Sequence, residues 1–548
     1  MKPTQEQFDR ARALHAGRVE AYRRGELQDS EFRAIRLSYG LYYQLDHTSY
    51  MQRIKLPGGL LTVPQIEALA GVTDDYGRGI THVTTRQDVQ IHWVPLERVA
   101  DIYQRLEAVG ITTRGACSDS VRNVTACPFA GVSPDEPFDV SPHMLAVHDF
   151  FLFNPLNLTL PRKFKIAVEG CPIDCAQATI NDIGLYARRR GEEIGFSVWA
   201  GGGLGAAPFL AVPIADFVPA EDVLIWCEAI ARVQHRSGER KNRHKARLKF
   251  LVKKVGVAAF VKMVAAEVER VDRERGAELR QDVRDAVRDY RVPPPAPARD
   301  PIAPRPGFED WARTNASPQR DPGFAAVTVT LPLGDVDTSQ LRAIGRLAHE
   351  LGNGTVRATN EQNLVLQWVR RSALPELHAA LVDLGLAEGQ ASLLTDVVSC
   401  PGLDYCSLAV TRSMGVGDRI RRHLADSDVD AESLGPFHVK ISGCPNSCGQ
   451  HHIGDVGLTG MMVKDDGGVE RPHYSLLLGG AVGEARTRIG RRLVGRYSEE
   501  DAPRAIAALA GFYRARRNDG ERFAEFVERV GVDELDAVAR AAAVDEVR

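Results

Sequence analysis

The sequence contains an internal duplication whose repeat unit is about half of its 548 residues long. Four segments of the first half recur in the same order in the second half, at an offset of about 275 residues. The pairs are 83–94 with 357–369, 163–185 with 437–458, 196–205 with 474–483, and 238–257 with 520–532. A repeat of this length far exceeds the roughly 20–50 residues of a solenoid unit, so the sequence predicts two related halves.

Within each half, the local patterns predict both strands and helices. Short alternating runs such as HVTTRQDVQIHWV, RKFKIAV and FSVWAGG predict strands, whereas ADIYQRLEAVG and AEDVLIWCEAIARVQH have helical periodicity. The predicted fold class is therefore α+β, with mixed α/β layers. The proline-rich segment 290–311 cannot continue a helix or a central strand, so we expect an extended linker between the halves.

Composition limits the classes of function. A chain of 548 residues is too long for one hydrophobic core, and its formal charge of −3 gives no general attraction to nucleic acid or an anionic membrane. The N-terminus lacks the apolar core of a signal peptide, and no run approaches the roughly 18 apolar residues of a membrane span. We therefore expect a cytoplasmic protein without nucleic-acid or membrane partners. Nine cysteines are too few for a disulfide scaffold in such a chain.

Four of these cysteines form two close pairs, in CPGLDYC (400–406) and GCPNSCG (443–449). Their spacing is compatible with an iron–sulfur cluster, a zinc site or plain buried cysteine, although the five-residue gap between Cys400 and Cys406 is long for structural zinc. Glycine and proline around Cys444 and Cys448 suit a tight turn that comes close to an inorganic group.

The pattern Cx5C followed by GCPNSCG resembles the signature of the siroheme nitrite/sulfite reductase family. The resemblance implies that Cys400, Cys406, Cys444 and Cys448 hold a 4Fe–4S cluster, and that Cys448 also bridges to the iron of siroheme. It further implies an internally duplicated siroheme nitrite/sulfite reductase fold with ferredoxin-like half-domains. The expected segments are a first ferredoxin-like half-domain (1–115), a first siroheme/4Fe–4S-type domain (116–289), a linker (290–320), a second half-domain (321–395) and a second siroheme/4Fe–4S domain (396–548).

Siroheme carries eight carboxylates and the substrate is an anion, so the site needs fixed cations. Lys163 and Lys165 lie two residues apart on a predicted strand and face one side; the alternative is that they protect a strand edge. The resemblance implies a substrate-binding set of Arg53, Arg122, Lys163 and Lys165. It assigns to the cofactor His82, Arg86, Gln90, His92, Arg162, Arg240, Lys241, Asn242, Lys245 and Asn446. For the run 239–247, a solvated basic helix face remains the alternative.

The implied activity is the six-electron reduction of sulfite to sulfide, of nitrite to ammonia, or of both. GGGLG (201–205) is not a dinucleotide motif, so we expect an external electron donor, ferredoxin or a flavoprotein. Plant nitrite reductases of the family have asparagine where this chain has Lys165, which favours sulfite. The alternatives are a nitrite reductase proper, a non-catalytic cluster protein, and a family enzyme of tetrapyrrole (cobalamin) synthesis.

The first half departs from the cluster pattern at one position. Cys127, Cys171 and Cys175 align with Cys400, Cys444 and Cys448, but Ser133 replaces the counterpart of Cys406. We interpret the three cysteines as remnants of the duplication, with a second metal site as the alternative. The resemblance also raises a covalent bond between Tyr42 and Cys117, which some sulfite-reducing relatives carry.

Overall fold

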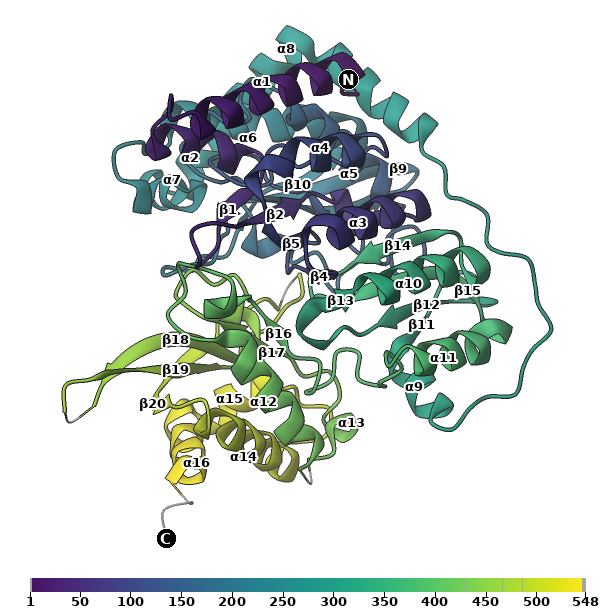
Figure 1. The fold of residues 1–548 in the computed structure, drawn as a ribbon, viewed down its shortest axis with the longest axis vertical. Coiled ribbons are helices and arrows are strands. Elements are labelled where there is room, and N and C mark those ends of the chain that lie inside the picture. The colour runs from purple at the N-terminus through teal and green to yellow at the C-terminus, as the bar shows by residue number, and fades with distance from the viewer. Residues whose placement is uncertain (1, 428, 466, 485, 545–548) are drawn as a thin grey trace.

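A computed structural model of the chain describes residues 2–427, 429–465, 467–484 and 486–544 (Figure 1). In these residues the strands form four five-stranded sheets, two for each half of the duplication.

The first sheet belongs to the N-terminal ferredoxin-like unit and has the order β1-β2-β5-β4-β13. Its strands are β1 (Leu41–Tyr43), β2 (Tyr50–Ile54), β5 (Val89–Val94), β4 (Ile80–Val83) and β13 (Asp335–Asp337). The accompanying helices are α1 (Gln5–Arg23), α2 (Asp29–Ser38), α3 (Val63–Tyr76) and α4 (Val99–Glu107).

The corresponding sheet of the second half has the order β11-β12-β15-β14-β3. Its strands are β11 (Ala316–Pro318), β12 (Phe324–Val329), β15 (Leu364–Arg370), β14 (Thr355–Ala358) and β3 (Leu60–Thr62). Its helices are α9 (Phe308–Asn315), α10 (Thr338–Leu351) and α11 (Leu374–Asp383).

The two ferredoxin-like units exchange an edge strand. Strand β3 of the first half pairs with β14 of the second, and β13 of the second pairs with β4 of the first. Helices α3 and α10, which directly follow the exchanged strands, pack against each other, and one hydrophobic core contains residues of both units. The exchange makes the two units one body, because neither sheet is complete without a strand from the other half.

The other two sheets also repeat each other, and each has its own hydrophobic core. The first has the order β10-β9-β8-β7-β6, with β10 (Val212–Pro219), β9 (Glu193–Ala200), β8 (Ile183–Arg190), β7 (Ile166–Glu169) and β6 (Thr125–Ala126). The second has the order β16-β17-β18-β19-β20, with β16 (Val398–Ser399), β17 (Val439–Ser442), β18 (Val456–Lys464), β19 (Glu470–Leu478) and β20 (Arg491–Tyr497).

In both of these sheets the first three strands in sequence run parallel and the last two pairings are antiparallel. Helices of the first are α5 (Ser141–Leu152), α6 (Val223–Ser237), α7 (Leu248–Val255) and α8 (Val257–Asp289). Helices of the second are α12 (Ser413–Ala425), α13 (Ala431–Leu434), α14 (Asp501–Arg516), α15 (Phe523–Val530) and α16 (Val532–Val544).

This architecture confirms the predicted α+β class and the duplication. The residue bounds expected for the five segments stay predictions. Within the expected linker, residues 291–307 contain no helix or strand and run along the outside of the molecule, but α9 begins at Phe308 and β11 follows it (Figure 1).

Two strand predictions need correction. HVTTRQDVQIHWV is not one strand but two, β4 and β5, joined by a turn at residues 84–88, where Gln87 has a positive φ of 54°. Strand β7 begins at Ile166, so Lys163 and Lys165 precede it, in an extended segment where Phe164 forms an isolated bridge with Val121. No helix of the described residues is long and apolar enough to cross a membrane.

Candidate cofactor and anion site between the halves

The four cysteines of the two motifs CPGLDYC and GCPNSCG lie on loops at the ends of β16 and β17. Cys400 directly follows β16, and Cys444 follows β17 after one glycine. Because β16 and β17 are parallel neighbours, both loops leave the same edge of the sheet. The Cys400 sulfur accepts a hydrogen bond from the Gly443 amide at 3.2 Å, which ties the two loops together. Cys400 and Cys444 are buried, Cys406 is partly buried, and Cys448 is exposed.

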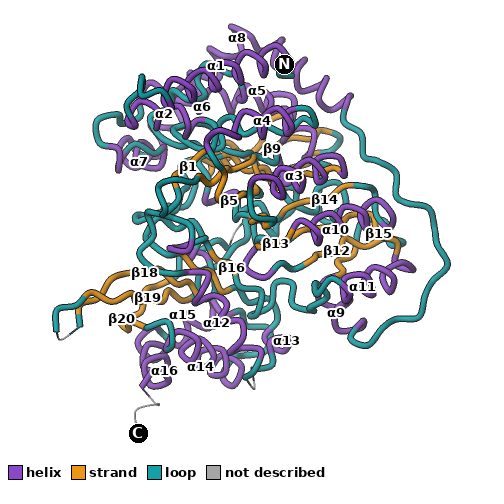
Figure 2. Tube along the Cα trace, viewed as in Figure 1, coloured by secondary structure: helices purple, strands orange, loops and turns teal. Residues whose placement is uncertain are grey.

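These loops face the first half of the chain. Thr85 Oγ1 donates a hydrogen bond to the Cys448 carbonyl at 2.7 Å, and Gln450 Nε2 donates to the Thr85 carbonyl at 3.2 Å. The ring of Tyr405, next to Cys406, lies 4.3 Å from the ring of His92. Loops dominate the region where the first half meets the C-terminal unit (Figure 2). The cysteine loops therefore meet the β4–β5 turn, 363 residues away in sequence from Cys448.

Burial acts against ionisation of three of the thiols. It raises the pKa of Cys400 to about 12 and, more weakly, the pKa values of Cys406 and Cys444. The charge of Cys448 acts in the same direction on all three. Four thiols that oppose one another's ionisation need a cationic centre among them to become thiolates together.

The four predicted anion-binding cations come from three segments of the first half. Arg53 on β2 donates to Cys117 Sγ at 3.5 Å, and its Nη2 lies 2.7 Å from the Gln90 side-chain oxygen when that amide faces it. Arg122 Nη2 donates to the Ser118 carbonyl at 2.7 Å. Lys163 and Lys165 lie on either side of Phe164, whose side chain is in the core, so both lysines point to the opposite side.

The two lysines are poorly solvated cations. Burial lowers the pKa of Lys163 to about 7 and lowers that of Lys165 well below its usual value, and neighbouring cations add to this. The negative charge of Cys448 acts in the opposite direction on both. Among the described residues, neither ammonium group makes a hydrogen bond or ion pair. Both are therefore available to an incoming anion.

The position of Lys165 is set by a buried ion pair that the sequence analysis missed. Asp182 Oδ2 accepts hydrogen bonds from the Lys165 amide at 2.9 Å and from Arg247 Nη2 at 2.5 Å. Arg247 packs closely on Gly203, where an added Cβ would lie 2.6 Å from its Nη1. Arg247 is the last residue of the basic run 239–247, and the sequence signal was the apolar residue Leu248 that follows it.

Asp88 and Lys55 were also missed. Asp88 is 3% exposed, and one of its carboxylate oxygens has no hydrogen-bond partner among the described residues. Burial raises the pKa of Asp88 to about 6, although Arg53, Arg86 and Lys55 oppose this. Burial also lowers the pKa of Lys55 to about 8. Lys55 lies close to the predicted Arg53 in QRIK, and Asp88 lies close to the predicted Arg86 in TTRQD. Neither motif indicates whether these charged side chains are buried or exposed.

The residues predicted to bind the cofactor do not all lie at this interface. His92 does, and neither of its ring nitrogens has a partner in the described structure. His82 is instead occupied by Asp335 at 2.8 Å and Gln362 at 3.1 Å, across the halves. Arg86 uses its guanidinium to hold Asn181 and the carbonyls of Asn123 and Ile166, and burial lowers its pKa to about 9.

Residues 240–245 of the basic run lie at the exterior. The side chains of Arg240, Lys241, Asn242 and Lys245 are exposed, and Arg240 donates to the carbonyls of Thr159 and His235. Arg162 and Arg243 share Asp119. Asn446 is exposed on the loop between Cys444 and Cys448. The cofactor roles of these residues stay predictions.

Two glutamines related by the duplication lock the turns together. Gln87 hydrogen-bonds both the amide and the carbonyl of Ala126 and donates to the Ala358 carbonyl of the second half. Gln362 makes the corresponding contacts from the second half: it donates to the Val83 carbonyl of the first half and accepts from the Ser399 amide beside Cys400. Each glutamine therefore connects one half to the other.

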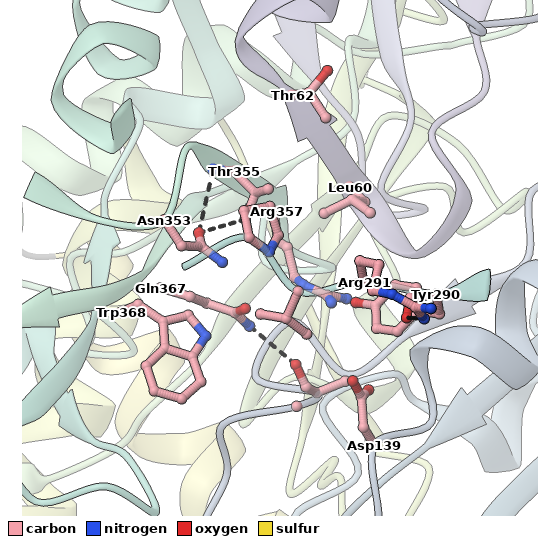
Figure 3. Close-up of a pocket in the computed structure, with 14 residues that line it drawn as sticks. Leu60, Thr62, Asp139, Tyr290, Arg291, Asn353, Thr355, Arg357, Gln367 and Trp368 are labelled. Atoms are coloured by element: carbon pink, nitrogen blue, oxygen red, sulfur yellow. Dashed lines mark hydrogen bonds between the residues drawn. The ribbon is translucent and has the colours of Figure 1, made fainter. Parts of the chain in front are cut away.

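The duplication also places a counterpart of this site in the second half, and the chain fills it. Glu361, which aligns with Arg86, pairs with Lys440 and accepts a hydrogen bond from Gln177 at 3.0 Å. Nearby, Arg357 and Gln367 align with His82 and His92 and line a cavity of about 100 Å³ (Figure 3). Ligand pockets usually enclose ~300–1,000 Å³. A cavity of this volume is too small for a macrocycle.

The chemistry of the residues at the first site fits a 4Fe–4S cluster next to a polycarboxylate haem. The site brings together four thiols, and also two ammonium groups and a histidine ring that have no hydrogen-bond partner among the described residues. No three of the four thiol sulfurs lie within 4.8 Å of one another in the described structure. The cysteine sulfurs around a 4Fe–4S cubane are far apart because each thiolate binds a different iron. The sulfur ligands of a single metal ion lie closer to one another.

Near the anion-binding cations, Tyr42 is enclosed by Cys117 and Arg53. Burial and the neighbouring Cys117 raise the pKa of Tyr42, and the Arg53 guanidinium carbon lies 5.7 Å from the Tyr42 ring centre. The structure thus brings together the pair for which a covalent bond was considered.

Comparisons with known proteins agree with this arrangement. The family model described as "Nitrite and sulphite reductase 4Fe-4S domain" matches residues 117–271 and 390–544. The model "Nitrite/Sulfite reductase ferredoxin-like half domain" matches residues 42–109 and 317–384. Both models match twice, once in each half.

Curated relatives include sulfite and nitrite reductases. A "Sulfite reductase [ferredoxin] 2" of Mycolicibacterium paratuberculosis is 30% identical over 90% of this chain and 84% of its own. A "Ferredoxin--nitrite reductase" of Synechococcus elongatus is 32% identical over 84% and 85%. The solved structure of Mycobacterium tuberculosis NirA is 28% identical, covers 94% of this chain and 95% of its own, and has a TM-score of 0.79. The chain therefore belongs to the nitrite and sulfite reductase family.

Proposed function

We propose that this protein catalyses the six-electron reduction of sulfite to sulfide, of nitrite to ammonia, or of both, with electrons from an external donor. The observation that carries the proposal is the contact between Thr85 and the Cys448 carbonyl. It brings the loop of cluster thiols from one half against the cation set of the other. A non-catalytic cluster protein would have no use for that set.

Cys400, Cys406, Cys444 and Cys448 would hold the 4Fe–4S cluster, with Cys448 shared with siroheme; Arg86, Gln90, His92 and Arg162 would contact the macrocycle. Bound siroheme and cluster supply the iron that takes the substrate and the stored electrons. The chain's own residues bind the anion, fix its surroundings and supply protons.

Arg53, Arg122, Lys163 and Lys165 would stabilise the anion electrostatically. Asp182 fixes the backbone of Lys165, so this cation is held in place before the substrate arrives. Preorganised charges need no rearrangement when negative charge develops on the substrate. The arrangement therefore favours binding of small, highly charged oxyanions.

Removal of the substrate's oxygens requires protons as well as electrons. A lysine whose pKa lies at about 7 holds and releases a proton readily near neutral pH. Lys163 Nζ is therefore our candidate proton donor. When a bound anion favours its ammonium form, Lys165 would add a second positive charge, which helps sulfite more than nitrite because sulfite carries the greater charge.

We propose ferredoxin or a flavoprotein as the donor and the cytoplasm as the location. The ferredoxin-dependent relatives support an external protein donor. The sequence has no dinucleotide-binding motif, which is consistent with electrons arriving from outside the chain.

The proposal is tested with protein purified without air. Absorption bands of siroheme and cluster, together with turnover of sulfite or nitrite by reduced ferredoxin or reduced methyl viologen, are expected. Lys163→Ala should lower kcat/KM by about 100-fold or more, as loss of a positioned acid or charge does. Lys262→Ala, which removes an exposed lysine on α8, is the matched control and should leave turnover unchanged.

The outcomes separate the alternatives. Cluster absorption without siroheme bands would indicate an electron carrier or sensor. Both cofactors without sulfite or nitrite turnover, together with activity on a tetrapyrrole precursor, would indicate the tetrapyrrole enzyme. A larger kcat/KM for nitrite than for sulfite would favour a nitrite reductase proper.

A further inference from the structure

Three cysteines of the first half, outside the site described above, have sulfur atoms that all lie within 4.8 Å of one another. They are Cys127, Cys171 and Cys175. Cys127 is fully buried, Cys171 is 5% exposed, and Cys175 is partly buried. All three are free thiols in the structure.

The fold brings the three together from parallel neighbouring strands. Cys127 directly follows β6, and Cys171 follows β7 after one glycine. The Cys127 amide donates to the Val168 carbonyl at 3.3 Å, which fixes one loop to the strand that leads into the other. The remaining cysteine lies four residues beyond Cys171, a C-x3-C spacing within the usual range for zinc ligands.

The loop from Cys171 to Cys175 is rigid. Glu169 accepts hydrogen bonds from the amides of Gly170, Cys171 and Ala176, at 2.8, 3.0 and 2.6 Å. Asp174 Oδ1 accepts one from the Ala178 amide at 2.7 Å. Because the backbone is held at both ends, the thiols are positioned without a ligand present.

The distances select a single ion over a cluster. With metal–sulfur bonds of about 2.3 Å, tetrahedral ligands of one zinc ion lie about 3.8 Å apart. The 4.8 Å limit on the triad admits this spacing. Thiolates of a cubane stand on different irons, and the sulfurs of Cys400, Cys406, Cys444 and Cys448 are correspondingly more spread in the described structure.

The surroundings argue against a second haem and a fourth thiolate. Gln177, two residues beyond Cys175, bonds Glu361, which with Lys440 fills the place where a macrocycle would face the triad. Ser133, at the position of Cys406, carries a hydroxyl that stays protonated at neutral pH and is a poor ligand. Its carbonyl accepts from Arg320 at 3.3 Å, which ties this loop to the second half.

We propose that Cys127, Cys171 and Cys175 bind one zinc ion, with a water molecule or Glu169 in the fourth position. Glu169 Oε1 lies 3.6 Å from Cys171 Sγ, so its carboxylate is next to the three thiols. Three soft thiolates at tetrahedral spacing favour zinc among common divalent ions. The ion would join the loops that follow β6 and β7. The second of these loops contacts the other half of the chain, because the Pro172 carbonyl accepts a hydrogen bond from the Glu484 amide at 3.3 Å. The zinc site is thus a structural site that stabilises the contact between halves.

The test uses the holoprotein, purified without chelators from cells grown with added zinc. Elemental analysis should give about one zinc and about five irons per chain, the latter being four from the cluster and one from siroheme. Zinc-edge X-ray absorption should show three sulfur ligands at about 2.3 Å and one lighter ligand at about 2.0 Å. This measurement sees zinc alone, so siroheme does not obscure it.

Two variants complete the test. Cys171→Ser with Cys175→Ser should lose at least about nine-tenths of the zinc and keep the five irons, since thiolates supply most of the affinity. Cys227→Ala removes a buried cysteine of α6 outside the triad and should keep both metals.

Four results would overturn the proposal. They are less than about 0.2 zinc per chain in the unaltered protein, about eight or nine irons that fall in the double variant, zinc retained in the double variant, and a disulfide within the triad, seen as a peptide pair two hydrogens lighter. The first measurement does not depend on any variant folding. Loss of sulfite and nitrite turnover alone would bear on the proposed reductase activity and not on this site.

Discussion

The reciprocal glutamines of the two β-turns make a quantitative prediction about how the halves are held together. Gln87→Leu keeps the approximate volume of the side chain but removes its amide. The amide and carbonyl of Ala126 and the carbonyl of Ala358 then lose their partner, at 2.9, 2.8 and 2.9 Å. Gln87 is fully buried, so water cannot readily replace these bonds.

Each buried polar group left without a partner costs ~1–3 kcal/mol. Three such groups place the loss of stability at about 3 kcal/mol or more. In a cooperative unit of ~150–250 residues this corresponds to a fall in Tm of about 6 °C or more. The Ala126 amide alone should exchange with deuterium about 5- to 150-fold faster, which is the same 1–3 kcal/mol expressed as a local opening equilibrium.

Thermal unfolding followed by circular dichroism and hydrogen–deuterium exchange mass spectrometry measure these effects. Gln104→Leu, on the exposed face of α4, is the matched control and should change stability by less than about 0.5 kcal/mol. Gln362→Leu should destabilise as much as Gln87→Leu and should also speed cluster loss, because it frees the Ser399 amide beside Cys400. If Gln87→Leu behaves like Gln104→Leu in both assays, the reasoning is wrong.

Further predictions concern the site itself. Lys165→Asn should reduce kcat/KM for sulfite more than for nitrite with reduced methyl viologen as donor; equal losses would mean that this lysine does not discriminate. Cys448→Ser should lose both the cluster and siroheme. If the variant keeps the full absorption of both cofactors and full activity, Cys448 is not the ligand that they share. Because burial lowers the pKa of Lys163 to about 7, the anion-binding ammonium form declines above that pH. KM for nitrite, whose charge is constant there, should rise by up to about tenfold per pH unit, and Lys163→Arg should flatten this rise. Peptide mass spectrometry decides whether Tyr42 and Cys117 are covalently joined: a linked peptide pair two hydrogens lighter supports the bond, and separate peptides reject it.

Some features could be predicted from local sequence because they depend on short-range chemistry. The duplication predicted that sheets would recur, and both sheet types do recur with equivalent strand orders. The cysteine spacings predicted which thiols share a loop, since a tight turn is decided by a few neighbouring residues. The helices at ADIYQRLEAVG and AEDVLIWCEAIARVQH follow from side-chain periodicity, which needs no distant partner.

Charged residues were harder to interpret, because burial depends on partners far away in sequence. Arg240 and Arg247 belong to the same basic run, yet Arg240 is exposed whereas Arg247 is buried against Asp182. Nothing within the run distinguishes them. His82, whose cofactor role stays a prediction, contacts Asp335, 253 residues away. Asp88 gave no sequence signal at all, since a carboxylate between two strands looks like an ordinary turn residue.

By itself, the sequence determined the family, the α+β class, the duplicated plan and the two cysteine motifs, because repeats and spacings survive in one dimension. Only the tertiary structure showed which half contributes the cluster thiols and which half contributes the anion-binding cations. The exchange of β3 and β13 joins the halves and sets the thiols of one against the cations of the other. In the mirror position, Glu361 pairs with Lys440, and the sulfur atoms of Cys127, Cys171 and Cys175 lie within 4.8 Å of one another. Backbone pairing across about 275 residues is selected by the packing of the whole molecule, so no local pattern could have specified it.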